Sequence, residues 1–147
     1  MKKRIFSTVV TGCLLALMIA VPAHAQISGT TMRVAIPFDF VVRGKTLPAG
    51  NYEIKRINDS PEGLVIRDIN DKHEQVMFVT ESVEAKAIPN ESEVIFHRYG
   101  DSYFLSEVFT AGEETGQELA PSRAERRLRR EVASNKAEPE TVALAVY

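Results

Sequence analysis

Residues 94–109 read VIFHRYGDSYFLSEVF, and the rest of the predicted fold is arranged around this stretch. Two runs rich in β-branched and aromatic residues flank Gly100-Asp101, a pair that tolerates the positive φ of a tight primed turn. The stretch contains five of the eleven aromatic residues of the chain. It therefore predicts a single β-hairpin that lies at the centre of the core.

A two-residue loop at Gly100-Asp101 sets the pairing of this hairpin, so that Tyr99 faces Ser102. Because side chains alternate along a strand, the pairing predicts two sides that are both substantially apolar. The first side holds Val94, Phe96, Tyr103, Leu105 and Phe109, and the second holds Ile95, His97, Tyr99, Phe104 and Val108. We therefore expect the main core to cover one side and a helix or second sheet to cover the other.

The N-terminus has the pattern of a signal peptide. Met1-Lys2-Lys3-Arg4 is basic, residues 5–21 form an almost uninterrupted apolar run, and Ala23-His24-Ala25 fits a small-x-small cleavage pattern. We predict a signal peptide over 1–25 with cleavage after Ala25, and hence a periplasmic or extracellular protein. Two alternatives remain open, an uncleaved membrane anchor and a lipoprotein cleavage box at residues 10–13.

Charge is distributed unevenly along the predicted mature chain. Residues 26–121 hold nine basic and 16 acidic residues, whereas residues 122–136 hold six basic and two acidic residues. The sequence thus predicts a basic segment attached to an acidic domain. Cleavage after Ala25 removes the only cysteine, which would leave the domain without disulfides or a thiol-based metal site.

Residues 26–121 predict a β domain. Six apolar residues alternate over residues 31–42, which is typical of a strand, and Pro37 predicts an edge position or a bend there. We expect further strands at residues 51–57, 64–68 and 75–80, a strand end and then a loop at 81–93, and an acidic loop at 111–116. The fold class is predicted to be all-β, a small antiparallel barrel or sandwich of about six to eight strands with one C-terminal α-helix.

Residues 122–133 predict that helix, which is basic and amphipathic. Ser122 and Glu125 fit a capping box at its start. We expect a thin apolar stripe and two favourable ion pairs four residues apart. The stripe is Ala124, Leu128 and Val132, and the pairs are Glu125–Arg129 and Arg127–Glu131. Residues 134–147 are predicted to be a linker followed by either a closing strand or a loose tail.

The helix also carries the strongest candidate contact surface. Arginines spaced 0, 3, 4 and 7 share one helical face, and such a stripe can bind phosphates or carboxylates through paired hydrogen bonds. These are Arg123, Arg126, Arg127 and Arg130, and we call them the arginine face. The alternatives are pairing with the acidic surface of the domain itself and simple solvation. Tyr99 and Tyr103 are candidates for exposed aromatic contacts.

No catalytic, cofactor-binding or metal-binding residue is predicted. His73 and His97 lack ligand spacing, and neither a nucleophile elbow nor a phosphate-binding loop is present. The residues therefore favour a non-enzymatic domain that binds a partner or serves as an envelope-associated structural protein. Its partner would be an anionic envelope component or another envelope protein, and not nucleic acid, because the domain is acidic.

Two other functions remain open. A barrel interior could carry a small apolar ligand, lined by Val34, Ile36, Phe38, Tyr52 and Leu105. A hydrolytic enzyme is less favoured, because it would need a concave pocket that holds His97 or converging carboxylates.

Four blocks of sequence carry a resemblance to a family. These blocks are residues 34–40 (VAIPFDF), 47–54 (LPAGNYEI), 96–105 (FHRYGDSYFL) and 120–125 (APSRAE). They resemble a group of small exported proteins abundant in acidobacteria, over most of the predicted mature chain. The resemblance implies export and a compact β domain, and it brings no activity, cofactor or catalytic residue.

Overall fold

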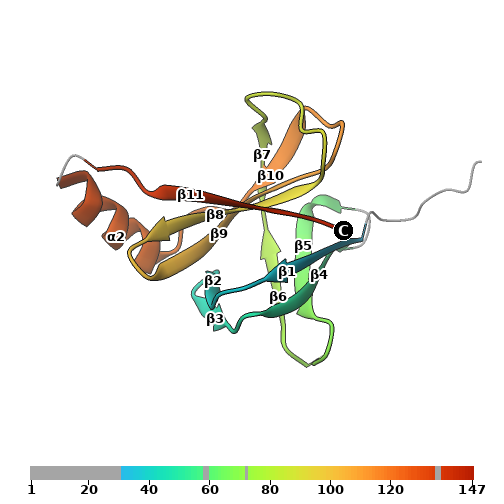
Figure 1. Ribbon diagram of the computed structural model, residues 1–147, viewed down its shortest axis with the longest axis horizontal. Helices are drawn as coiled ribbons and strands as arrows, with labels where there is room; N and C mark the ends of the chain where they lie inside the picture. The colour runs from blue at the N-terminus through green and yellow to red at the C-terminus, as the bar shows by residue number, and fades with distance from the viewer. Residues whose placement is uncertain (1–30, 58–59, 72, 135–136) are drawn as a thin grey trace, which may run out of the picture.

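The computed structural model describes residues 31–57, 60–71, 73–134 and 137–147, so the predicted signal peptide lies outside the described residues. Within these described residues, eleven strands form two sheets, with one C-terminal helix (Figure 1). The strands are β1 (Met32–Ile36), β2 (Phe40–Val42), β3 (Lys45–Leu47), β4 (Gly50–Ile57), β5 (Ser60–Asp68), β6 (Gln75–Val79), β7 (Glu81–Glu84), β8 (Glu93–Tyr99), β9 (Ser102–Phe109), β10 (Thr115–Glu118) and β11 (Glu140–Ala145). The helix is α2 (Arg123–Ser134).

The predicted all-β class is confirmed, as a sandwich and not as a closed barrel. One sheet has the strand order β1-β4-β5-β6, and the other has the order β11-β8-β9-β10-β7, with β2 pairing to both β3 and β9. The strand count exceeds the predicted six to eight, partly because the predicted strand over residues 31–42 is divided in two.

Pro37 lies where that division occurs. The chain leaves the first sheet at the end of β1 and joins the second sheet at β2, which runs parallel to β9. Pro37 cannot donate a ladder hydrogen bond, so the change of sheet takes place where pairing would be incomplete in any case. The alternating apolar residues of both strands still face one interior, and Phe38 between them packs against the same core.

The β8–β9 hairpin pairs as predicted from its turn as far as Phe96 and Leu105. Gly100 has a φ of 61°, which fits the first loop position of a type II′ turn. Beyond Phe96 the register shifts, because Ile95 pairs with Glu107 and Ser106 is an extra, bulged residue. Because of this bulge, the predicted sides of the hairpin are wrong beyond Phe96 and Leu105.

Past the bulge, Val108 and Phe109 exchange the sides predicted for them. Val108 lies opposite Val94 and joins the main core, together with Phe96 and Leu105. Phe109 moves to the second side, where its ring lies against Gly116 of β10. A Cβ at Gly116 would lie only 2.4 Å from that ring, so a glycine is required there. The predicted loop at 111–116 is therefore wrong at its end, because Thr115 begins β10.

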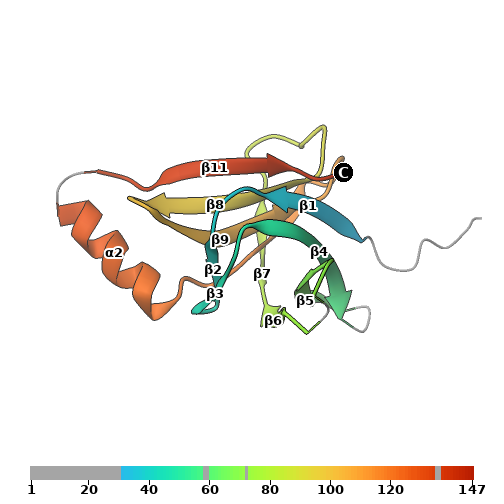
Figure 2. The same cartoon turned by 60° about the horizontal axis from the view of Figure 1, so that its bottom comes forward.

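The second side of the hairpin is buried as well. Tyr99, Phe104 and Phe109 are all buried, and α2 packs beside the turn end of the ribbon (Figure 2). The expectation that both sides are covered is confirmed. Residues 140–145 form β11 along β8, and the Tyr147 amide donates to the Arg33 carbonyl, which joins the C-terminus to β1.

A buried carboxylate lies on the outer side of β4. Glu53 accepts a hydrogen bond of 2.6 Å from Arg67, and the Lys55 Nζ lies 3.1 Å from the same oxygen. Burial alone would raise the pKa of Glu53, but the hydrogen bonds from Arg67 and Lys55 outweigh burial and lower it. This carboxylate therefore favours the folded state above its ordinary pKa, and that contribution is lost as the pH falls below it.

We expect the free energy of unfolding to fall as the pH is lowered below about 4.5, the ordinary pKa of Glu53. In Glu53→Gln this part of the pH dependence should be absent, and stability at neutral pH should be lower by about 1–3 kcal/mol. Urea unfolding at several pH values measures both effects. Glu91→Gln removes a carboxylate from an exposed loop and is the control; an identical pH dependence in the two variants would contradict the assignment.

Candidate functional site

Helix α2 begins as the sequence predicts. The Glu125 amide donates to the Ser122 Oγ at 3.1 Å, and the Arg126 amide donates to the Ser122 carbonyl at 2.9 Å. Ser122 is therefore the N-cap, in keeping with its short oxygen-bearing side chain. The Glu125 carboxylate, by contrast, is directed at the β8–β9 hairpin and is buried there.

This carboxylate anchors the helix to the sheet. The Glu125 Oε1 lies 3.3 Å from the His97 Nδ1, and the His97 Nε2 lies 3.4 Å from the Ser106 Oγ. Ser106 is the bulged residue of β9, so the bulge places its hydroxyl beside His97. Only 5% of Glu125 and 3% of Ser106 are exposed. A buried polar chain of this kind fixes the position of its members, because an unpaired buried carboxylate is costly.

The anchor sets the rotation of α2 about its own axis. Glu125 is buried, and Leu128 and Val132 are half-buried on the same side. Ala124 is exposed. The predicted apolar stripe is therefore wrong at this residue, because Glu125 takes the place of Ala124 on the side that faces the sheet. The predicted Glu125–Arg129 pair is also wrong, because Glu125 is turned inward to His97.

This rotation leaves the whole arginine face exposed. Arg127 forms the predicted pair with Glu131 at 3.6 Å, and the Arg126 guanidinium donates to the Pro121 carbonyl. An exposed pair of this type stabilises by about 0.5 kcal/mol or less, so it leaves Arg127 available to other anions. Among the described residues, no ion pair joins the arginine face to the acidic β domain.

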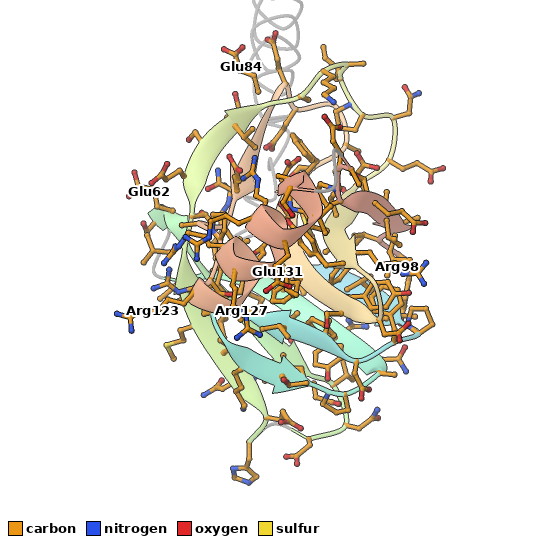
Figure 3. All side chains as sticks on the ribbon, turned by 90° about the vertical axis from the view of Figure 1, so that its left-hand side faces the viewer. Glu62, Glu84, Arg98, Arg123, Arg127 and Glu131 are labelled. Atoms are coloured by element: carbon orange, nitrogen blue, oxygen red, sulfur yellow. The ribbon has the colours of Figure 1, made fainter. Side chains whose placement is uncertain are left out.

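Figure 3 looks onto α2 and shows Arg123 and Arg127 along the helix, on the other side of the view from Arg98. A further arginine, which sequence reasoning missed, extends this surface. Arg43 lines one surface hollow together with Arg123 and Arg126, and Gly44 and Pro121 also line it. Arg43-Gly44 was predictable as a turn, and both residues have positive φ, but its position beside α2 depends on contacts remote in sequence.

The two tyrosines do not form the predicted exposed pair. Tyr99 is only 6% exposed, and its ring lies edge-on to Phe104 with the centroids 5.7 Å apart, so its assignment as an exposed contact is wrong. Burial and the Glu125 carboxylate raise the pKa of Tyr99. Tyr103 is half-buried; its ring stacks on Phe38 at 3.8 Å, and the Arg98 guanidinium lies 5.5 Å from the ring centroid.

The arrangement of Ser106, His97 and Glu125 has the connectivity of a hydrolase triad, because the two ring nitrogens of His97 face a hydroxyl and a carboxylate. A nucleophile must also reach its substrate. His97 and Arg129 line a surface hollow, but Ser106 is not among the residues that line it. The burial of the hydroxyl therefore favours a structural role for the three residues.

The interior between the sheets does not favour an apolar carrier. Val34, Ile36, Tyr52 and Leu105 of the predicted lining are buried in the core, and Phe38 packs against it. A hollow beside this core, lined in part by Met32, Ile54 and Val108, has a volume of about 20 Å³. Such a volume accommodates about one water molecule.

Among the described residues, no group of three or more His, Cys, Asp or Glu side chains could hold a metal ion. Within the same residues, no helix has the length and apolar character that crossing a membrane requires. Comparison of the chain with protein-family models, with curated proteins and with solved structures finds no match. The resemblance to exported acidobacterial proteins therefore stays a prediction.

If Glu125 anchors α2, Glu125→Ala should lower the free energy of unfolding by about 1–3 kcal/mol, because His97 loses its buried partner. It should also speed trypsin cleavage after the arginines of α2 under native conditions, since the helix would separate from the sheet more often. Glu131→Ala changes an exposed glutamate of the same helix and should alter stability by less than about 0.5 kcal/mol. Equal cleavage rates in the two variants would contradict the anchoring role.

Proposed function

We propose that the protein is an exported, non-enzymatic binding domain whose arginine face contacts an anionic component of the cell envelope. The observation that carries the proposal is the rotation of α2. The buried Glu125 is held 3.3 Å from His97, and this contact turns all four arginines of the face outward. Guanidinium groups fixed on one exposed helix face can form paired hydrogen bonds to phosphate or carboxylate groups.

Charge distribution supports the same proposal. The arginine face belongs to a segment with six basic and two acidic residues, while residues 26–121 carry nine basic and 16 acidic residues. An anionic surface would attract the helix and repel the β domain, so the protein would approach it with α2 first. Arg43 adds a fifth guanidinium from the β2–β3 turn to the near end of this surface.

The predicted signal peptide supplies the location of the partner. Export would bring the arginine face next to phosphate- or carboxylate-bearing molecules of the envelope. The carrier alternative is less well supported, since side chains fill the space between the sheets. The hydrolase alternative is less well supported because Ser106 is buried.

A variant with four substitutions tests the proposal. We expect the purified protein to co-sediment with its own envelope fraction at low salt and to be released at high salt, because salt screens exposed charges. Replacing Arg123, Arg126, Arg127 and Arg130 with Gln should weaken this binding at least tenfold, since each basic residue near an anionic surface contributes about 1 kcal/mol.

The matched control removes the same net charge elsewhere, through Lys45, Arg56, Lys86 and Arg98 replaced with Gln. Circular dichroism checks that both variants remain folded. The proposal requires the control to bind more tightly than the arginine-face variant. Equal binding by both variants, or unchanged binding by the arginine-face variant, would exclude this surface as the contact.

A further inference from the structure

Among the described residues, strand β6 is the outer strand of its sheet and pairs with no strand other than β5 (Figure 1). Its five residues, QVMFV, include no charged residue and no proline. Each other outer strand among those described carries a charge, on Arg33 in β1, Lys45 in β3, Glu81 in β7 and Glu140 in β11. Charges and prolines are the usual features that prevent a sheet edge from pairing with another chain, so β6 is the unprotected edge.

The backbone of β6 presents a regular set of outward groups. The Thr80 amide donates to the Glu62 carbonyl at 2.8 Å, and the Asp68 amide donates to the Glu74 carbonyl at 3.0 Å. Residues 74 and 80 therefore direct their backbone groups toward β5. Since these groups alternate along an antiparallel strand, the N–H and C=O groups of Gln75, Met77 and Val79 point away from β5.

These outward groups have no partner among the described residues. Arg43 and Met77 line a common hollow, and Lys45 approaches Glu74 at 3.6 Å, but neither basic residue bonds to the backbone of β6. The side chains of Met77 and Val79 are 64% and 63% exposed. An edge with free backbone groups and exposed apolar side chains is the kind of surface to which a further strand adds.

We propose that β6 pairs in antiparallel fashion with β6 of a second copy of this chain, across a two-fold axis at Met77. In this register Met77 exchanges two hydrogen bonds with its own copy, and Gln75 exchanges two with Val79 on each side of the axis, about six in all. This register requires the backbone N–H and C=O groups of residues 75, 77 and 79 to point away from β5, and they do so. The proposal is independent of the arginine face.

Charge and symmetry favour a second copy as the occupant of this edge. The register places Glu74 opposite Thr80, so no like charges face each other across the pair. A two-fold pair uses the same patch on both copies and closes after two, which is the commonest form of assembly in soluble oligomers.

Sedimentation equilibrium on the purified protein, expressed from its full-length sequence, tests the proposal. We expect a monomer–dimer equilibrium and concentration-dependent protection of the amide hydrogens of Gln75, Met77 and Val79 from exchange. Met77→Lys should weaken the dimer at least tenfold, because it places two ammonium groups opposite each other. Ile88→Lys is the matched control, since Ile88 is 58% exposed in the segment between β7 and β8, and it should leave the dimer unchanged.

Met77→Pro tests the backbone contribution separately. The Met77 N–H points away from β5, so proline should leave the monomer folded and remove the two central hydrogen bonds of the dimer. A protein that stays monomeric at every concentration up to about 1 mM would overturn the proposal. Its dimerisation free energy would then be weaker than about 4 kcal/mol. A dimer that persists in both Met77 variants would also overturn it, as would open-ended aggregates in place of a dimer.

Discussion

Phe96 lies at the centre of the β8–β9 hairpin, fully buried, with Phe38 and Phe40 packed edge-to-face against it at 5.3 and 5.5 Å. The hairpin that carries it is buried on both sides, and the position of the other elements follows from that constraint. The first sheet and β2 cover one side of the hairpin and complete the main core. The other side needs α2 near the turn and the glycine of β10 near Phe109.

The same constraint connects the fold to the candidate site. The bulge at Ser106 restores the apolar residues of β9 to the main core and places a hydroxyl beside His97 on the opposite side. His97 then receives the buried Glu125. Leu128 and Val132 are only half-buried, so apolar contact alone would fix the rotation of α2 weakly. The directional contact between Glu125 and His97 supplies what the apolar stripe lacks, and the outward orientation of the arginine face follows from it.

Local sequence signals predicted the features that depend on residues close together in the sequence. Gly100-Asp101 indicated the turn and the pairing up to Phe96, and Ser122 indicated the start of the helix. The extra residue at Ser106 has no such signal, because a bulge is defined by the partner strand. The burial of Tyr99 and the position of Arg43 were missed for a similar reason, since both depend on α2, which lies remote in sequence from each. Strand β10 escaped prediction because its pairing with β7 and β9 is non-local and its residues are mostly polar.

The β8–β9 hairpin holds the two sheets and the helix together. The free energy of unfolding of Phe96→Ala, measured by urea titration, tests this role. We expect a loss of about 3–5 kcal/mol, because a fully buried aromatic ring is removed from the contact between the sheets. A loss below about 1 kcal/mol, in the range of an ordinary surface substitution, would contradict it.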